Sequence, residues 1–505
     1  MKKKSDLSEL ILLMSMILLL LLFGYVKRGM DQEEALRKQT VISKEQKNLV
    51  ADEAFAQKIS TENEIIRDSK DAESDEKEPD TEAQTTGIQS ITETAESTAR
   101  IRVLIKTNQF ESYYHKQVIL SGNTTLHLND TIYEAKSGET LTIESDSEWF
   151  CEDQIHVEPT DQEAGTAVLS LERASGTPVY EGTLDIYRTE NGMILVNELD
   201  LETYLRYVVP SEMPASYEEE ALKAQAVCAR TYAWKQILEE DLSKYHAHVD
   251  DSVSYQVYHN LDPKPSTDEA VKATEGEIMT CDGEPITAYF FSTSCGFTST
   301  DEVWNGKAGE SFLKSVYVGD GDEEQDQADK TEEAFASFIK SKDENNLEVE
   351  DAWYRWNVTL PSDVIRERLL DQTIGEITGM SIQKRSDGGA VEQLRITGTN
   401  GTTVIENEYQ IRQLLSVKGY AVAKNDGNVT KEMNLLPSAY FLVTPVEKDG
   451  KISAFTFWGG GYGHGVGMSQ NGANHLAAQG YSYREILSYF YQNIELTKWN
   501  DACSG

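Results

Sequence analysis

A single carboxylate between two prolines is the first feature of this sequence that points to chemistry. Glu212 is the middle residue of the segment Pro210-Ser211-Glu212-Met213-Pro214. Each proline fixes its own φ and biases the residue before it away from helix, so the sequence predicts a stiff, non-helical turn at Glu212. A glutamate held on a rigid corner can act as a general acid. The alternative is a structural role, in which Glu212 caps or salt-bridges the helix that follows.

The residues on either side of Glu212 predict a strand-like run and then a helix. Residues 191–209 (NGMILVNELDLETYLRYVV) are largely apolar, and their pattern is typical of a strand. Ser216 and Glu219 have the spacing of a capping box, which predicts a helix from about Tyr217 to Glu239. Small residues recur in this helix and allow another backbone to approach it closely: Ala221, Ala224, Ala226, Ala229 and Ala233.

A glycine-rich segment near the C-terminus is the second feature that points to chemistry. Residues 459–473 read GGGYGHGVGMSQNGA, and seven of these fifteen residues are glycine, which indicates unusual backbone angles or close packing. The segment matches neither a dinucleotide-binding fingerprint nor a phosphate-binding loop. It nearly matches a nucleophile elbow, but Asn471 stands where the final glycine is required. His464 lies at its centre and either faces a ligand or has a structural role.

Capping signals place two helices after the glycine-rich segment. Ser469 fits the N-cap of a helix over Gln470–Gln479 that Gly480 closes. Ser482 and Glu485 form a further capping box, which predicts another helix from Ser482.

The N-terminus predicts a membrane anchor. Three lysines precede an uncharged, mostly apolar run at residues 10–26, and no small-x-small cleavage site follows it. We therefore expect residues 1–9 in the cytoplasm, residues 10–26 as a single-pass transmembrane anchor, and the body outside the cytoplasm of a Gram-positive-type envelope. The alternative is a cleaved signal peptide with an atypical site.

The remaining regions indicate an α+β protein with a β-rich body. Residues 27–98 are too poor in apolar residues to fold alone and predict a disordered or helical spacer. Residues 100–190 are short alternating segments that predict an N-terminal antiparallel β region, which reaches to about Leu199. Residues 191–500 form a further domain with an acidic insertion at 320–350, in which the capped helix lies behind the Glu212 corner.

Charge and cysteine content exclude several classes of function. The 86 acidic residues outnumber the 46 basic ones, giving a net charge of −40, which argues against nucleic acid as a partner. The five cysteines include no CxxC pair, so neither a disulfide framework nor a structural zinc site is indicated.

Several motifs together resemble the family of stage II sporulation protein D and the amidase enhancer. They are residues 194–234 (ILVNELDLETYLRYVVPSEMPASYEEEALKAQAVCARTYAW), YFFSTSCGFTS, WYRWNVTL, LRITGTNGT and GGGYGHGVGMSQNGA. The resemblance covers roughly residues 182–496 and implies that 191–500 is a catalytic domain. It implies a peptidoglycan lytic transglycosylase that cleaves glycan strands to 1,6-anhydro-muramic ends in sporulation engulfment or cell-wall remodelling.

The resemblance also implies roles for individual residues. The glutamate of the PSEMP motif, here Glu212, is the catalytic acid in that family, and such an enzyme needs only this one carboxyl group because the substrate supplies the nucleophile. Expected partners are glycan strands, a cell-wall amidase and other engulfment proteins. Further residues are expected to bind substrate: Gln225, Arg230, Tyr232, Ser292, Thr293, Tyr462, His464 and Gln470. For Arg230 the alternative is an ordinary salt bridge, for Tyr232 a place in the core, and for Ser292 and Thr293 a turn at a strand end.

The sequence departs from the family pattern at one place. Some relatives hold zinc with a Cys-Asp-x-x-His-Cys-Gln-Val-Tyr stretch and a later cysteine, but residues 250–258 here read DDSVSYQVY. Of these ligands only Cys295 remains, so we expect no metal and no cofactor, with Cys295 as a small buried residue beside the cleft.

Two other functions remain open. The body can bind peptidoglycan and stimulate a separate amidase without cleaving anything. A hydrolase that uses Cys295 and His464 is a third reading, although no motif spacing supports it.

Overall fold

The computed structural model describes residues 99–502, apart from 122–123, 129–130, 137, 151, 162–164, 307–308, 320–331 and 371. The predicted anchor, the spacer and the first part of the acidic insertion lie outside the described residues. Among the helices that are described, none is long and apolar enough to cross a membrane.

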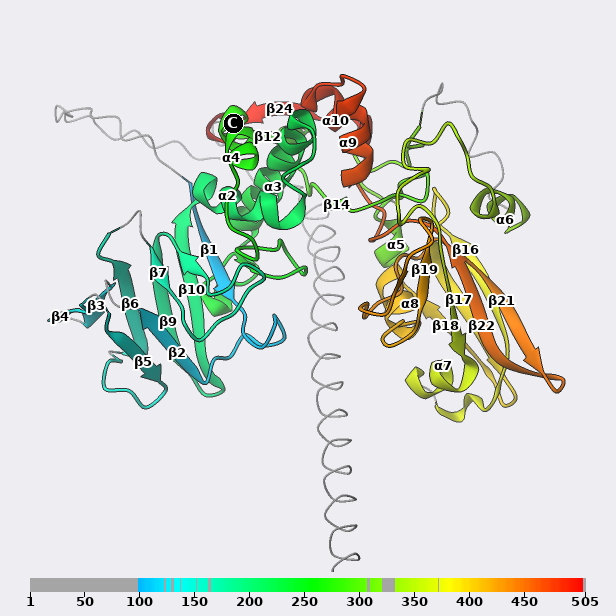
Figure 1. Ribbon diagram of the computed structural model, residues 1–505, viewed down its shortest axis with the longest axis horizontal. Coiled ribbons are helices and arrows are strands. Elements are labelled where there is room, and N and C mark those ends of the chain that lie inside the picture. Colours follow the sequence, from blue (N-terminus) through cyan, green and yellow to red (C-terminus); the bar gives the residue numbers. More distant parts are fainter. Residues whose placement is uncertain are drawn as a thin grey trace, which may run out of the picture. The chain divides into compact units, whose positions relative to one another are not determined.

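A seven-stranded sheet forms the core of the N-terminal region, blue to cyan in Figure 1. Its order is β11-β1-β10-β9-β6-β3-β4, and neighbours run antiparallel except β1 and β11. The expected antiparallel region is therefore present. The strands in and beside this sheet are β1 (Arg100–Ile105), β2 (Gln117–Ser121), β3 (Thr124–Leu128), β4 (Thr131–Glu134), β5 (Thr140–Glu144), β6 (Gln154–Pro159), β7 (Thr166–Ala167), β8 (Val179–Tyr180), β9 (Thr183–Thr189), β10 (Gly192–Asp200) and β11 (Val249–Asp250).

Helix α2 (Leu201–Glu212) corrects the expectation of a continuous strand and a non-helical turn. The chain leaves β10 at Asp200, whose carboxylate accepts hydrogen bonds from the N–H groups of Glu202 and Thr203 and so starts a helix. Buried residues then recur at helical spacing. Pro210 lies in the last turn, and Glu212 is the last residue of the helix. Met213, which precedes Pro214, is extended. An apolar run can form a strand or a helix, and here the Asp200 cap determines that residues 201–212 form a helix.

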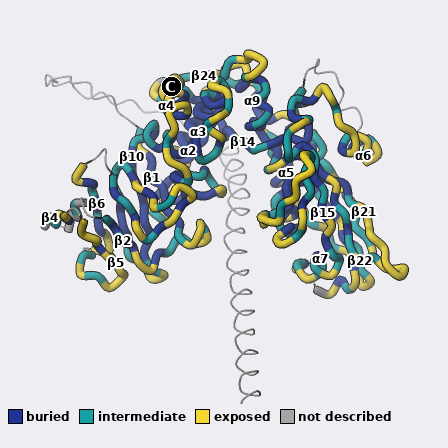
Figure 2. The backbone as a smooth tube through the Cα atoms, viewed as in Figure 1, coloured by how far each residue is buried: buried dark blue, intermediate teal, exposed yellow. Residues whose placement is uncertain are grey.

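Helix α3 (Glu219–Glu239) confirms the predicted helix but not its capping box. Its N-cap is Glu218, and no side chain caps it. The Glu218 N–H instead donates to the Asn474 side chain at 2.8 Å, because packing against α9 fixes this end. Most of the helix is buried (Figure 2), and it packs on α2, α4, α9, α10 and β12. The surrounding elements are η1 (Ser243–Tyr245), α4 (Pro265–Ala273), β12 (Glu277–Cys281), β13 (Glu284–Pro285), β14 (Phe290–Phe291), α5 (Glu302–Asn305), β23 (Met468–Ser469), α9 (Gln470–Ala478), α10 (Tyr483–Phe490), β24 (Glu495–Lys498) and α11 (Trp499–Ala502).

The two predicted caps at the C-terminal end are confirmed. The Ser469 hydroxyl accepts from the Gly472 N–H at the start of α9, and Ser482 and Glu485 form both hydrogen bonds of a capping box at α10. β14 pairs in parallel with β23, which brings residues 290–291 beside the start of α9.

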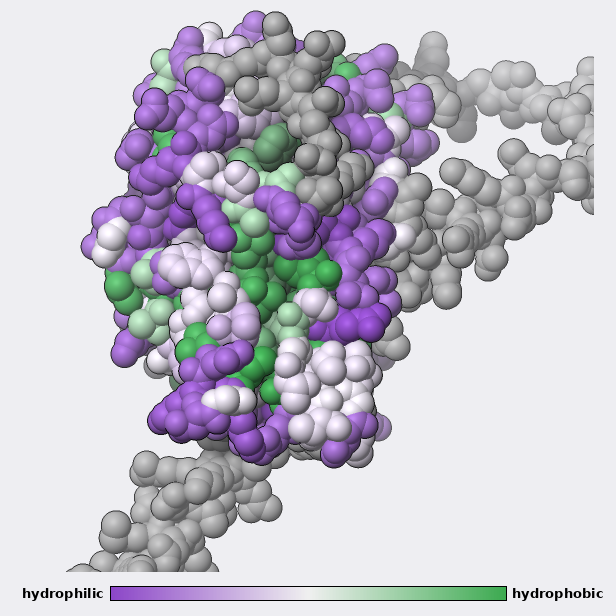
Figure 3. All heavy atoms as spheres, turned by 90° about the vertical axis from the view of Figure 1, so that its right-hand side faces the viewer, coloured by the Kyte–Doolittle hydropathy of each residue, from purple (hydrophilic) through white to green (hydrophobic). Residues whose placement is uncertain are grey.

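The residues between α5 and β23 build two further sheets around a second core. A five-stranded sheet has the order β20-β19-β15-β22-β21, and a three-stranded sheet has the order β16-β17-β18. On the side that Figure 3 shows, hydrophilic residues surround a narrow hydrophobic band. The elements are α6 (Glu332–Lys340), β15 (Trp356–Pro361), α7 (Ser362–Arg368), η2 (Gln372–Ile374), β16 (Ile377–Arg385), β17 (Val391–Gly398), β18 (Thr402–Glu406), α8 (Glu408–Leu414), β19 (Val422–Lys424), β20 (Val429–Thr430), β21 (Phe441–Lys448) and β22 (Lys451–Gly459).

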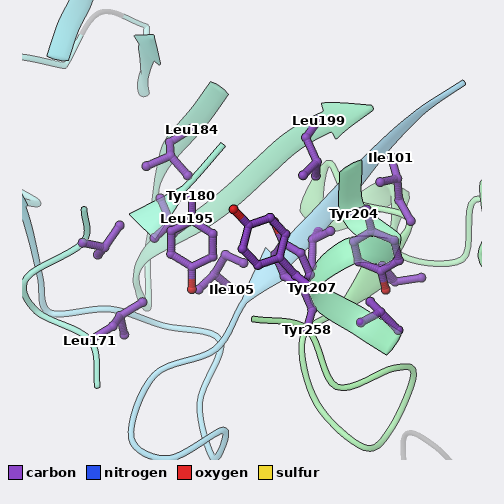
Figure 4. Close-up of a cluster of buried hydrophobic side chains, with 14 of the residues drawn as sticks. Ile101, Ile105, Leu171, Tyr180, Leu184, Leu195, Leu199, Tyr204, Tyr207 and Tyr258 are labelled. Atoms are coloured by element: carbon purple, nitrogen blue, oxygen red, sulfur yellow. The ribbon is translucent and has the colours of Figure 1, made fainter. Parts of the chain in front are cut away.

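A group of tyrosines joins α2 to the first sheet. Tyr204 and Tyr207 of α2 lie against Tyr258, with ring centroids 4.9 and 6.0 Å apart, in the hydrophobic cluster of Figure 4. These large buried rings fix α2, and therefore its last residue, relative to the strands.

Candidate active site

Glu212 ends α2 with its carboxyl group partly buried. Its Oε1 accepts a hydrogen bond from the backbone N–H of Val257 at 2.6 Å. Removal from water disfavours the charged form and raises the pKa of Glu212 to about 7, while the Val257 N–H acts in the opposite direction. The carboxyl group is thus poised to donate and accept a proton near neutral pH. Partial exposure leaves it within reach of a ligand.

Gln470 and Gln225 lie directly behind Glu212. The Gln470 side-chain amide, at the first position of α9, donates to the backbone carbonyl of Glu212 at 3.1 Å and to Gln225 Oε1 at 3.3 Å. Gln225 belongs to α3 and is completely buried, and its Nε2 has no hydrogen-bond partner among the residues that the structure describes. The small-residue helix and the glycine-rich segment therefore meet at the Glu212 corner and hold its backbone.

A line of polar side chains extends from this corner to Tyr462. Thr293 Oγ1 accepts from the Asn471 amide at 3.0 Å, and the hydroxyl of Tyr217 donates to the other side of the same amide. Ser292 is partly exposed, with its hydroxyl 3.2 Å from that of Thr293. Tyr462 and Thr293 exchange both backbone hydrogen bonds, at 2.8 and 3.1 Å. Five predicted residues thus lie in one connected array with Glu212: Gln225, Gln470, Ser292, Thr293 and Tyr462.

Tyr462 presents an exposed aromatic ring beside this array. It is 37% exposed and stacks on Trp353 with centroids 4.8 Å apart and an interplanar angle of 21°. A flat, partly solvated aromatic ring is suited to the apolar face of a sugar.

A second carboxyl group, that of Glu348, is completely buried and is hydrogen-bonded to residues next to the array. It accepts from the Ser294 N–H at 3.0 Å, from the Ser294 hydroxyl, and from the Ser469 hydroxyl at 2.6 Å. Burial raises the pKa of Glu348 to about 7. Glu348 has no exposed surface, so it binds the two chain segments together and does not contact a ligand.

His464 and Tyr232 belong to an aromatic cluster centred on Tyr289. Their ring centroids lie 6.1 and 6.4 Å from that of Tyr289. His464 Nδ1 accepts from the Val466 N–H at 3.1 Å, and burial lowers the pKa of His464 to about 3, which keeps the ring neutral. Among the described residues, no hydrogen bond connects its side chain to the Glu212 array. His464 is partly exposed, and its role in binding substrate stays a prediction.

The glycines around His464 are required by close packing. A Cβ on Gly467, where φ is +77°, would lie 2.0 Å from the carbonyl oxygen of Tyr289. A Cβ on Gly463, where φ is +116°, would lie 2.8 Å from Cβ of Phe291. The glycine content thus reflects the contact between the loop and residues 289–291.

Arg230 lies apart from the Glu212 array. Its guanidinium makes a bidentate pair with Glu202, both N–O distances being 2.7 Å, and its other N–H groups bind the carbonyls of Val271 and Glu277 and the Thr274 hydroxyl. The side chain is completely buried. All five of its donors are bound within the protein. This agrees with an ordinary salt bridge, the alternative given above, and not with substrate binding.

Cys295 does not form a reactive pair with His464. The thiol is buried, and burial raises its pKa to about 11, so it is not a thiolate at neutral pH. In the described part of the chain, no group of three or more His, Cys, Asp or Glu residues is placed to hold a metal ion.

Comparison with known proteins identifies the class to which this site belongs. Residues 189–281 match the family model described as stage II sporulation protein, and residues 298–467 match that of a domain of unknown function (DUF8618). The first match contains Glu212, Gln225 and Tyr232. The second ends within the glycine-rich segment.

Individual relatives agree with this class. Stage II sporulation protein D of Bacillus amyloliquefaciens is 28% identical over 331 residues, which are 63% of this chain and 79% of that protein. The same-named protein of Bacillus subtilis (strain 168) is 28% identical over 365 residues, 67% of this chain and 88% of that protein. The amidase enhancer of Bacillus subtilis (strain 168) is 29% identical over 305 residues, 58% of this chain but only 40% of that protein. These matches confirm the resemblance, seen in the motifs, to the family of stage II sporulation protein D and the amidase enhancer.

Sequence reasoning missed three of the residues that build the site. Asn471 stands inside the glycine-rich motif, and its place beside Gln470 could have identified it. Val257 acts through its backbone, and Glu348 lies in a segment without a motif, so no local pattern points to either residue.

Proposed function

We propose that this protein is a peptidoglycan lytic transglycosylase with Glu212 as its single acid and base. The supporting observation is a partly buried carboxyl group with a pKa of about 7 and one hydrogen-bond donor, next to an array of sugar-compatible polar groups. No cofactor enters this proposal, and glycan strands are the substrate.

The proposed reaction balances without water. Glu212 donates its proton to the glycosidic oxygen as the bond from C1 of the muramic residue to that oxygen breaks. The resulting carboxylate then removes the proton of the 6-hydroxyl of the same sugar while O6 bonds to C1. The product is a 1,6-anhydro end, and Glu212 returns to its protonated state. A pKa near the working pH suits both steps.

Mass spectrometry of glycan fragments tests this proposal. The full chain is incubated with peptide-free glycan, and the ends are expected to be lighter by one water than hydrolysis products. Glu212→Gln keeps the side-chain shape but has no acid proton, so cleavage is expected to fall on the order of 10²–10⁴-fold. Reducing ends from the wild type, or a Gln variant of near wild-type rate, would refute it.

A second candidate is a peptidoglycan-binding protein that stimulates an amidase. It is favoured by the name of one relative, the amidase enhancer, of which this chain spans 40%. Wild-type protein that binds glycan and accelerates a purified cell-wall amidase without producing any anhydro ends would support this candidate over the first.

We also propose that residues 10–26 anchor the body on the outer side of the cell membrane, where its substrate lies. Protease added to intact protoplasts is expected to remove the body. Full protection, or mature protein in the medium cut near residue 30, would refute the anchor.

A further inference from the structure

The loop over residues 250–258 is the part of the protein that holds the Glu212 carboxyl group. Its Val257 N–H donates to Glu212 Oε1 at 2.6 Å. The loop closes on itself, because the Tyr258 N–H donates to the carbonyl of Asp251 at 3.3 Å. Val253, at the loop's tip, is 87% exposed. The position of Val257 therefore depends on how the two ends of the loop are fixed.

The first end is fixed by charged groups of the N-terminal sheet region. Arg173 Nη2 donates to Asp251 Oδ2 at 2.7 Å and to the Lys106 carbonyl at 2.7 Å. The Lys106 N–H donates to the other carboxylate oxygen of Asp251 at 2.9 Å. Both side chains of the Arg173–Asp251 pair are buried, at 1% and 0% exposure. Asp250 is held nearby by Lys106 Nζ at 3.5 Å.

The second end is fixed by strand β10 and by helices α2 and α3. The Tyr258 hydroxyl donates to Asn197 Oδ1 at 2.6 Å, and its ring packs on Tyr204 (Figure 4). The Gln256 amide donates to the Ala229 carbonyl at 3.2 Å and accepts from the Tyr204 hydroxyl. Burial raises the pKa of the Tyr204 hydroxyl, and the nearby Glu212 charge raises it further. This end is shared with the helix that carries Glu212, whereas the first end is not.

We propose that Arg173 and Asp251 are positioning residues, which set the Val257 N–H on the Glu212 carboxyl group and close the loop over it. The proposal rests on the function proposed for Glu212. Arg173 lies in the N-terminal β region, outside the 189–281 match. The proposal therefore gives this region a part in the active site, in addition to packing against it.

Matched variants test the proposal in the full chain. Arg173→Met and Asp251→Asn each remove one partner of the pair. The double variant removes both charges and should fold even where a single variant does not, because it leaves neither partner as an unpaired buried charge. Arg188→Met is the control, since Arg188 pairs at 2.6 Å with the exposed Asp153 in the same sheet region. Circular dichroism and thermal unfolding establish which variants are folded.

Two readouts separate positioning from a purely structural role. The first is the titration of the Glu212 side-chain carbonyl carbon by ¹³C NMR, assigned through its loss in Glu212→Gln. The second is kcat and KM for the formation of anhydro ends. In folded variants we expect kcat to fall about tenfold or more with KM little changed, since a small misplacement of a catalytic group is costly. We expect the Glu212 midpoint to move, downward if water enters or upward if only the Val257 hydrogen bond is lost.

The two proposals can fail separately. If the wild type makes no anhydro ends, the proposed function fails, while the NMR titration still tests the role of Arg173. If a folded Arg173 or Asp251 variant keeps both kcat and the Glu212 midpoint, as the control is expected to, the positioning role is refuted.

Discussion

The substitution Glu212→Gln is expected to stabilise the protein at alkaline pH. Burial raises the pKa of Glu212 from its ordinary 4.5 to about 7, a difference of about 2.5 units. At 1.36 kcal/mol per unit this corresponds to about 3.4 kcal/mol, which partial exposure reduces to roughly 1.5–3 kcal/mol. Glutamine keeps the shape, and its Oε1 can still accept from the Val257 N–H. The variant therefore avoids the cost of burying a charge.

The sign of the pH dependence follows from proton binding. Between pH 4.5 and about 7 the folded protein holds the Glu212 proton and the unfolded chain does not, so wild-type stability from this group falls as pH rises. The stability difference between variant and wild type should be within about 0.5 kcal/mol at pH 4 and reach its plateau above pH 8. Other buried acids such as Glu348 titrate in both proteins and cancel in the difference.

Urea unfolding across this pH range measures the effect. Glu269→Gln is a suitable control, because it makes the same change at an exposed position on α4. A Glu212→Gln variant that is less stable than the wild type at pH 8, or whose advantage is the same at pH 4 and pH 8, would show that the carboxyl group is not held in the way described.

Four further predictions follow from the same contacts. Wild-type glycan cleavage should fall about tenfold per pH unit above about pH 7, because the acid must be protonated, and a rate that is flat from pH 6 to 9 would contradict this. Glu348→Ala should destabilise by about 3 kcal/mol or more in urea, since buried donors of Ser294 and Ser469 lose their acceptor, while Glu348→Gln should cost less. Arg230→Met should lower the free energy of unfolding by about 3–5 kcal/mol, because the Glu202 carboxylate loses its guanidinium partner and keeps only the Gly276 N–H. The folded variant should bind glycan normally, and weakened binding would restore a substrate role for Arg230. Exhaustive chelation should leave cleavage unchanged, because residues 250–258 lack the cysteines and histidine of zinc-binding relatives, and one zinc per chain in a metal analysis would contradict this.

Local sequence signals predicted the elements whose ends are fixed by neighbours in sequence. The caps at Ser469 and Ser482 were predicted correctly because each hydroxyl bonds a backbone N–H three residues later. The Ser216 cap failed, since α9, more than 250 residues away, supplies the partner of the Glu218 N–H. The strand prediction failed over residues 201–209 because an apolar run fits a strand or a helix, and the Asp200 cap starts a helix here.

The candidate site shows the same division between local and distant contacts. The PSEMP segment contains Glu212 and the glycine-rich segment contains Gln470, and the structure brings these two residues into contact. Arg230 shares the helix of Gln225, but it faces Glu202, and the motif alone does not distinguish these two directions. Val257 reaches Glu212 across 45 residues of sequence, so only the folded chain reveals it.

The two candidate functions make different demands on Glu212. A protein that only grips glycan gains nothing from a carboxyl group whose burial lowers stability at neutral and alkaline pH, since an amide would make the same hydrogen bond with the Val257 N–H and avoid that cost. An acid that must give up and recover a proton needs that pKa, and active sites commonly retain such destabilising groups. Stabilisation by Glu212→Gln together with lost cleavage would therefore favour the enzyme. Stabilisation with unchanged amidase stimulation and no anhydro ends in the wild type would favour the binding protein.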